Sequence, residues 1–80
     1  MTTRKIKLIW DFRGPAAEKT AAHHEVHLKE FLHSENLSLD ITGMTRINEM
    51  HSLAFLVVEE NEMLKVRDAL KPHRAEVFID

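Results

Sequence analysis

The stretch that most constrains the fold is the run Leu53–Val58, which is apolar at every position (LAFLVV). A strand with one face in solvent alternates apolar and polar side chains, so a continuous apolar run predicts a strand covered on both faces. Such a strand belongs in the interior of a sheet. The rest of the chain must therefore supply a neighbouring strand on each side of it, together with helices that cover the sheet.

A strand, a tight turn and a long helix are predicted in the first half of the chain. Residues 5–12 alternate, and this places Ile6, Leu8, Trp10 and Phe12 on one face of a strand. Gly14 permits a sharp turn, and Pro15 suits the first position of a helix. Apolar side chains then recur at helical spacing as far as residue 35, and Asn36 is a suitable left-handed residue to end that helix.

The second half of the chain predicts three more elements around the apolar run. Residues 38–47 alternate again, with Gly43 as the expected site of a bulge. Asn61 can cap a second helix, which Pro72 ends. Residues 74–80 then alternate as a last strand.

The resulting order is strand, helix, strand, strand, helix, strand, within one domain that spans residues 1–80. With right-handed crossovers this order predicts a ferredoxin-like α+β sandwich, in which a four-stranded antiparallel sheet carries both helices on one face. The first and third strands are central in that arrangement, as the apolar run requires. The expected core consists of Ile6, Leu8, Trp10, Phe12, Leu28, Phe31, Leu39, Ile41, Val66, Leu70 and Val77.

The composition argues against several classes of partner. The formal net charge is −2, and the sequence contains no long run of like charge, so neither nucleic acid nor a membrane surface is an expected partner. The apolar run is far too short to cross a bilayer. Cysteine is absent, which excludes disulfides and thiolate chemistry and fits a reducing compartment. The cytoplasm is therefore the expected location.

The richest candidate chemistry lies on the first helix and at the end of the strand before it. His23 and His27 are one helical turn apart and could chelate a divalent metal, although a closed site needs further ligands. Thr20 and Glu30 lie on the same flank of the helix. Asp11 and Arg13 end the strand, where Arg13 could clamp a carboxylate or phosphate. Half-exposed histidines and a surface ion pair are the simpler interpretations, and no cofactor is assigned beyond this divalent metal.

Two aromatic residues on this part of the chain are expected in the core. Trp10 is expected to be buried with its N–H bonded to a nearby acceptor, for which His24 is a candidate. His24 falls on the apolar stripe of the helix, so we expect a buried, hydrogen-bonded side chain.

The element order and a few short motifs resemble two families that share this fold. His27-Leu28 is similar to the His-Leu pair of the YciI-like branch of the dimeric α/β-barrel proteins, a group that also contains small monooxygenase-like and isomerase-like members. This resemblance implies two subunits whose open sheet faces pack together and often enclose a ligand. Asp11-Phe12-Arg13-Gly14 is similar to the first turn of ACT-type regulatory domains, where amino-acid effectors bind. Neither resemblance carries over a catalytic residue.

The leading functional hypothesis is a homodimeric binding module for a small ligand, with no chemistry of its own. The open face of the sheet is expected to carry Ile9, Met44, Phe78 and half of the LAFLVV side chains, a patch seldom left bare on a monomer. One alternative is a small enzyme of the dimeric α/β-barrel type that uses histidine acid–base or metal chemistry. Another is a purely structural or interaction protein.

Overall fold

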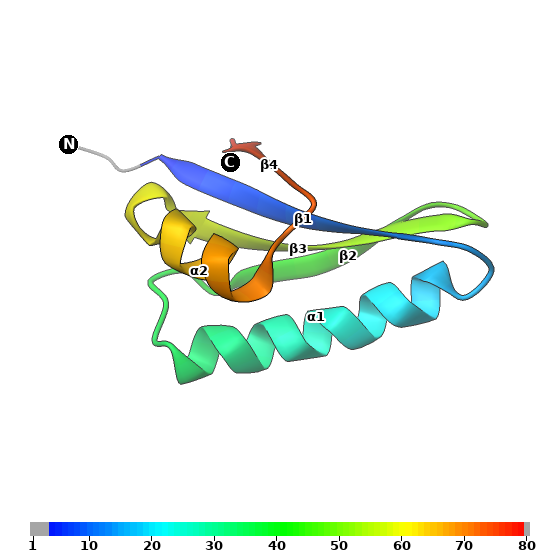
Figure 1. Cartoon of the computed structure of the whole chain (residues 1–80), viewed down its shortest axis with the longest axis horizontal. Coiled ribbons are helices and arrows are strands. Elements are labelled where there is room, and N and C mark those ends of the chain that lie inside the picture. Colours follow the sequence, from blue (N-terminus) through cyan, green and yellow to red (C-terminus); the bar gives the residue numbers. More distant parts are fainter. Residues whose placement is uncertain (1–3, 80) are drawn as a thin grey trace.

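The computed structural model describes residues 4–79, and it has the predicted ferredoxin-like α+β architecture (Figure 1). The chain order is β1 (Lys5–Arg13), α1 (Ala17–Ser34), β2 (Ile41–Asn48), β3 (His51–Glu59), the 3₁₀ turn η1 (Glu60–Glu62), α2 (Met63–Leu70) and β4 (Arg74–Phe78). The sheet order is β2-β3-β1-β4, and all three pairings are antiparallel. β1 and β3 are therefore central, and the apolar run lies inside β3.

The core lies between the sheet and the two helices, which cover the same face of the sheet. Buried side chains from β1 and β3 meet Ala21, Leu28 and Leu32 of α1 and Val66 of α2. α1 has 18 residues, so it extends about 27 Å along the sheet. α2 has only eight residues. This difference in length leaves part of the sheet uncovered at the β4 edge, where α2 is too short to screen the strand.

Most of the expected core is confirmed, and the exceptions lie on the edge strands or just before one of them. Ile6, Leu8, Trp10, Leu28 and Val66 are buried, while Phe12, Phe31 and Leu70 are partly buried and pack against the same cluster. Leu39 and Ile41 are only partly buried, and Ile41 pairs with Val57 on the face away from the helices. Val77 is 49% exposed, so its assignment to the core was wrong. It faces the helix side of β4, but α2 does not reach it.

The boundaries of the helices follow local backbone chemistry. α1 begins at Ala17 rather than Pro15, which lies in the preceding turn with Gly14 at φ +111°. Asn36 is left-handed at φ +53°, as expected for the end of this helix. α2 begins at Met63 because residues 60–62 form the 3₁₀ turn, so Asn61 does not cap it.

Gly43 does not form the expected bulge. It pairs regularly with Phe55, and the irregularity in this ladder lies between Arg46 and Asn48 instead. A Cβ atom on Gly43 would lie 2.6 Å from the Phe55 ring. Glycine at this position therefore gives the ring room to lie across β2. The Lys7 Nζ atom lies 4.4 Å from the centroid of the same ring.

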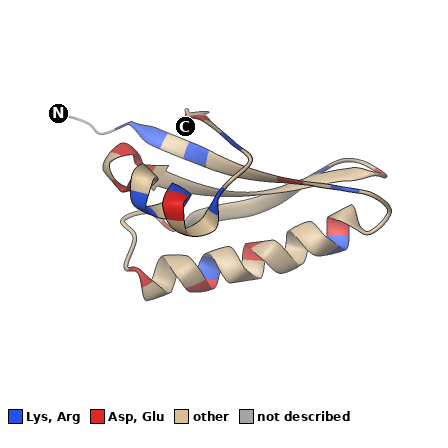
Figure 2. Cartoon of the chain, in the orientation of Figure 1, with Lys and Arg blue, Asp and Glu red and all other residues tan. Residues whose placement is uncertain are grey.

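The last strand is shorter than predicted, because β4 ends at Phe78 and Asp80 lies outside the described residues. Within residues 4–79, no helix is long and apolar enough to span a membrane. Figure 2 shows acidic and basic residues interspersed along the elements rather than gathered by sign.

Candidate functional site

The face of the sheet away from the helices, called the open face below, carries the most organised polar chemistry. Strand alternation and the pairing register determine its members. They are Lys5, Lys7, Ile9, Asp11 and Arg13 of β1; Ile41, Gly43 and Thr45 of β2; His51, Leu53, Phe55, Val57 and Glu59 of β3; and Arg74, Glu76 and Phe78 of β4. Met44 was expected here, but it lies on the helix side and packs against the core.

Asp11 is the centre of a three-residue network on this face. Its carboxylate accepts hydrogen bonds from Arg74 Nε at 2.9 Å and Arg74 Nη2 at 3.2 Å, and its Oδ1 atom lies 2.8 Å from His51 Nε2. The side chains of Asp11 and His51 are only 15% and 13% exposed. β1 lies between β3 and β4, which explains how one aspartate contacts a residue from each neighbour.

The network keeps Asp11 ionised. The hydrogen bonds from Arg74, and then those from His51, lower the pKa of the Asp11 carboxyl to about 2, against the opposing effect of burial. An ionised carboxylate only accepts hydrogen bonds, so the proton between the two groups belongs to His51 Nε2. In the neutral imidazole, His51 Nδ1 is then the free acceptor.

Arg13 extends this polar cluster towards the end of the sheet. It is the cross-strand partner of His51, and its side chain is exposed. Arg13, His51 and Arg74 therefore place three basic side chains beside a single carboxylate. Arginine presents a planar set of donors that matches a carboxylate or phosphate. The open-face cluster, defined as Asp11, Arg13, His51 and Arg74, is suited to bind a small anion.

The structure separates the two halves of the site predicted from the sequence. Asp11 and Arg13 lie on the open face, whereas the Thr20–Glu30 row lies on α1, across the sheet from them. The Thr20 hydroxyl donates to the Ala16 carbonyl at 2.9 Å. The sheet therefore prevents a single small ligand from contacting both halves within one chain.

The histidines of α1 lie close together as the helical spacing requires. The rings of His23 and His27 are edge to face, with centroids 5.7 Å apart, and His27 Nδ1 lies 3.3 Å from Glu30 Oε1. Thr20 and His23 line a shallow hollow of about 300 Å³ with Lys19. Among residues 4–79, no group of three or more His, Cys, Asp and Glu side chains is arranged to hold a metal ion. The pair alone offers two ligands.

His24 lies against two aromatic rings. Its ring centroid is 5.0 Å from that of Trp10 and 5.4 Å from that of Phe12. Its Nε2 atom is buried without a hydrogen-bond partner among residues 4–79, since the Trp10 N–H donates to the Leu70 carbonyl at 3.0 Å instead. The expected hydrogen bonding of His24 was therefore wrong at this nitrogen. Burial lowers the pKa of His24, and the charges of His27 and His73 lower it further.

His73 contributes to the site through the backbone. Its Nδ1 atom accepts the Asp11 N–H at 2.8 Å, and its own N–H donates to the Ile9 carbonyl at 2.9 Å. These two bonds fasten the start of β4 to β1 beside the carboxylate. The sequence did not mark His73, His51 or Arg74 as partners of Asp11.

Comparison with known proteins identifies no family: no protein-family model matches the chain, and neither a curated protein nor a solved structure is significantly similar to it. The function must therefore be argued from the chemistry of the open face.

Proposed function

We propose that this chain is a homodimeric binding module in which two open faces pack together and the open-face cluster binds a small anionic ligand. The observation that carries this proposal is the Asp11–His51–Arg74 network, in which Asp11 and His51 are largely buried, on a face that neither helix of residues 4–79 covers. We further propose the cytoplasm as its location, because a chain without cysteine needs no oxidising compartment.

The centre of the open face supports association of two copies. Ile9, Leu53 and Val57 are buried among their neighbours, whereas Phe55 and Phe78 are only partly covered. Two-fold packing of two such faces would cover the rings. Polar side chains at the edges of this surface would leave the open-face cluster near the rim, where a ligand can enter.

The ligand class follows from the charges of the cluster. Asp11 neutralises one positive charge, and Arg74 remains 49% exposed while it bonds to Asp11. Arg13 is exposed beside His51. The guanidinium groups of Arg13 and Arg74 would therefore offer donors to a monovalent carboxylate or inorganic phosphate, since Asp11 does not occupy all of them.

Light scattering at micromolar concentration tests the dimer. We expect about twice the 9.3 kDa chain mass for the wild type, and the mass of a single chain for Phe55→Glu, which places a charge at the centre of the open face. Val26→Glu is the matched control, because Val26 is exposed on α1 outside this face. A monomeric wild type would refute the interface.

Calorimetric titration with phosphate and acetate tests the ligand site. We expect saturable binding to the wild type and at least tenfold weaker binding to Arg13→Gln and Arg74→Gln, since each removes a guanidinium donor. His33→Ala, at the exposed end of α1, should bind like the wild type. A dimer without any anion binding would instead support the purely structural alternative.

One observation favours the enzyme alternative. The 2.8 Å contact between His51 Nε2 and Asp11 Oδ1 is the arrangement that orients an imidazole so that its other nitrogen can act as a general base. Hydrolysis of activated esters that is lost in His51→Ala and retained in His33→Ala would favour this function over simple binding. If neither the wild type nor His33→Ala hydrolyses the esters, binding remains the preferred function.

A further inference from the structure

A cavity lies between α2 and β4, on the helix side of the sheet. It has a volume of about 330 Å³ and is lined by Leu8, Met63, Arg67, Pro72, His73, Arg74 and Ala75. We call it the α2–β4 groove. Its volume lies at the lower end of the range for small-molecule pockets, about 300–1,000 Å³.

The groove exists because α2 is short. Its eight residues cover Leu8 but leave the helix side of β4 uncovered. Ala75 contributes only a methyl group at this edge, and Val77, the next residue of β4 on the same side, is 49% exposed. The helix side of β4 next to the cavity therefore presents exposed apolar side chains.

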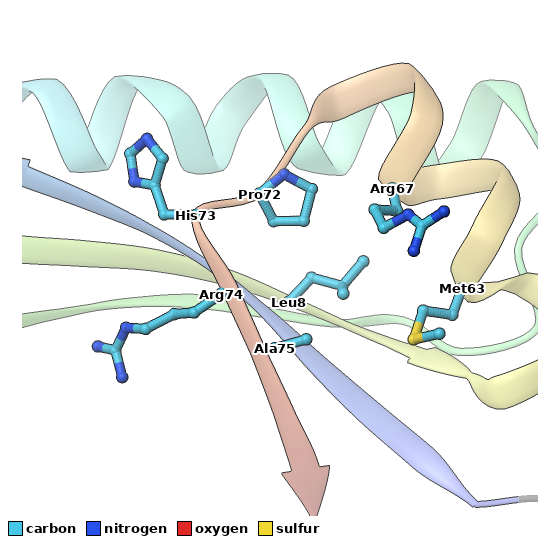
Figure 3. A pocket seen from close by; sticks show the side chains of 7 residues that line it. All are labelled: Leu8, Met63, Arg67, Pro72, His73, Arg74 and Ala75. Carbon is cyan, nitrogen blue, oxygen red and sulfur yellow. The ribbon is translucent and has the colours of Figure 1, made fainter.

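The lining of the groove combines apolar residues, Leu8, Met63, Pro72 and Ala75, with the basic residues Arg67, His73 and Arg74. Figure 3 shows Leu8 and Met63 projecting into it from β1 and α2, with Arg67 beside them, while the Arg74 side chain points away. Within residues 4–79, the carboxylate nearest Arg67 is that of Asp68, at 3.6 Å from Nη2, and Asp68 itself is 75% exposed. Such an exposed pair contributes little and leaves the guanidinium able to form a bidentate contact.

From this geometry we infer that the α2–β4 groove binds a medium-chain aliphatic carboxylate, with its carboxylate on Arg67 and its chain along Met63, Pro72 and Ala75. Charge complementarity selects the anionic head, and the apolar walls select the tail. Met63 suits this role because its unbranched side chain adapts to irregular ligands. This site does not depend on the open face or on the dimer.

Octanoate, used well below its micellar concentration, is the probe for calorimetric titration. In Arg13→Gln, which weakens the open-face site, we expect one octanoate per chain, with acetate and octanol each binding at least tenfold more weakly because one lacks the tail and the other the charge. Arg67→Gln should weaken octanoate binding at least tenfold, and Ala75→Leu should abolish it by filling the groove. Arg46→Gln, on β2 at the opposite edge of the sheet, is the matched control and should bind normally.

Two further measurements separate this site from the other interpretations. Octanoate should shift the methyl resonance of Met63 in the wild type, which needs no variant to fold. It should bind the groove equally well in Arg13→Gln and in the wild type, so that loss of the open-face site does not affect it. Equal binding of octanol and octanoate, unchanged binding in Arg67→Gln, or recruitment of the protein to anionic vesicles without octanoate saturation would overturn the inference.

Discussion

Replacing Asp11 by asparagine tests the network at the centre of the proposed site. The substitution keeps the size of the side chain and removes its charge. The pKa of the Asp11 carboxyl is about 2 in the folded protein, compared with an ordinary value of 3.8, and this difference corresponds to at most about 2.5 kcal/mol of stability at neutral pH. Because Arg74 is half exposed, solvent screening reduces that figure, and we expect Asp11→Asn to cost about 1–2 kcal/mol.

The stabilisation by Asp11 depends on pH in a direction that follows from its lowered pKa. The folded protein binds fewer protons at Asp11 than the unfolded chain between pH 3.8 and about 2, so this stabilisation is complete above about pH 5 and disappears as the pH falls. Asp11→Asn lacks the titrating group. The difference in unfolding free energy between wild type and variant should therefore be largest at pH 5–7 and should shrink towards pH 3.

Urea unfolding followed by Trp10 fluorescence at pH 7, 5, 4 and 3 measures that difference. Asp40→Asn is the control, because Asp40 is an exposed carboxylate in the segment before β2. Arg74→Gln should cause a similar loss, and the double variant with Asp11→Asn should lose less than the sum of the two. A difference that stays constant with pH, or one no larger than that of Asp40→Asn, would refute the assignment of Asp11 as a charged, half-buried centre.

Three further predictions concern other residues. Gly43→Ala should cost about 1–3 kcal/mol in urea unfolding because its Cβ would lie 2.6 Å from the Phe55 ring, and combination with Phe55→Ala should relieve part of that cost; strict additivity would contradict this. His24→Ala should destabilise the protein by about 1–3 kcal/mol at pH 7. Because burial lowers the pKa of His24 in the folded protein, protonation of this ring in the unfolded chain below pH 6.5 destabilises the wild type, and the difference in unfolding free energy between wild type and variant should become smaller. A difference that grows on acidification would contradict this reasoning. His23→Ala and His27→Ala should each change the unfolding free energy by less than about 0.5 kcal/mol, because both rings are exposed. Calorimetric titration with nickel tests whether His23 and His27 bind a metal. If they do, the wild type should release or absorb heat of binding that is missing from both variants.

The fold could be predicted because its central strands have unambiguous patterns. The alternation of β1 and the continuous apolar run of β3 both reflect their positions between other strands. The edge strands were less predictable. Val77 has the right alternation for the core, but its burial depends on the length of α2, which residue pattern alone did not determine. Ile41 was misplaced because the start of β2 is set by its pairing with β3 rather than by the preceding apolar residue, Leu39.

The candidate site was only half predictable for a related reason. Helical spacing is fixed, so the proximity of His23 and His27 followed directly from the sequence. Contacts between strands depend on register, and no hairpin turn joins β1 to β3 or to β4 and sets the register of those pairings. The partners of Asp11 could therefore not be identified, and Arg13 was considered beside it although Arg74 forms the bonds.

Because these contacts depend on strand register, the Asp11–His51–Arg74 network also contributes to the alignment of β4. β4 pairs over only five residues, and its apolar side chains are poorly covered, so the hydrophobic pattern specifies its register weakly. A slip of one residue would move Arg74 to the helix side of the sheet and leave the half-buried carboxylate of Asp11 without its guanidinium. It would also break the two bonds to the β1 backbone that His73 makes, one through its ring Nδ1 and one through its N–H. The cost of leaving this carboxylate unpaired therefore opposes the slipped pairing where the apolar contacts of β4 are few. The polar cluster proposed to bind an anion is in this way also the feature that aligns the edge strand beside it.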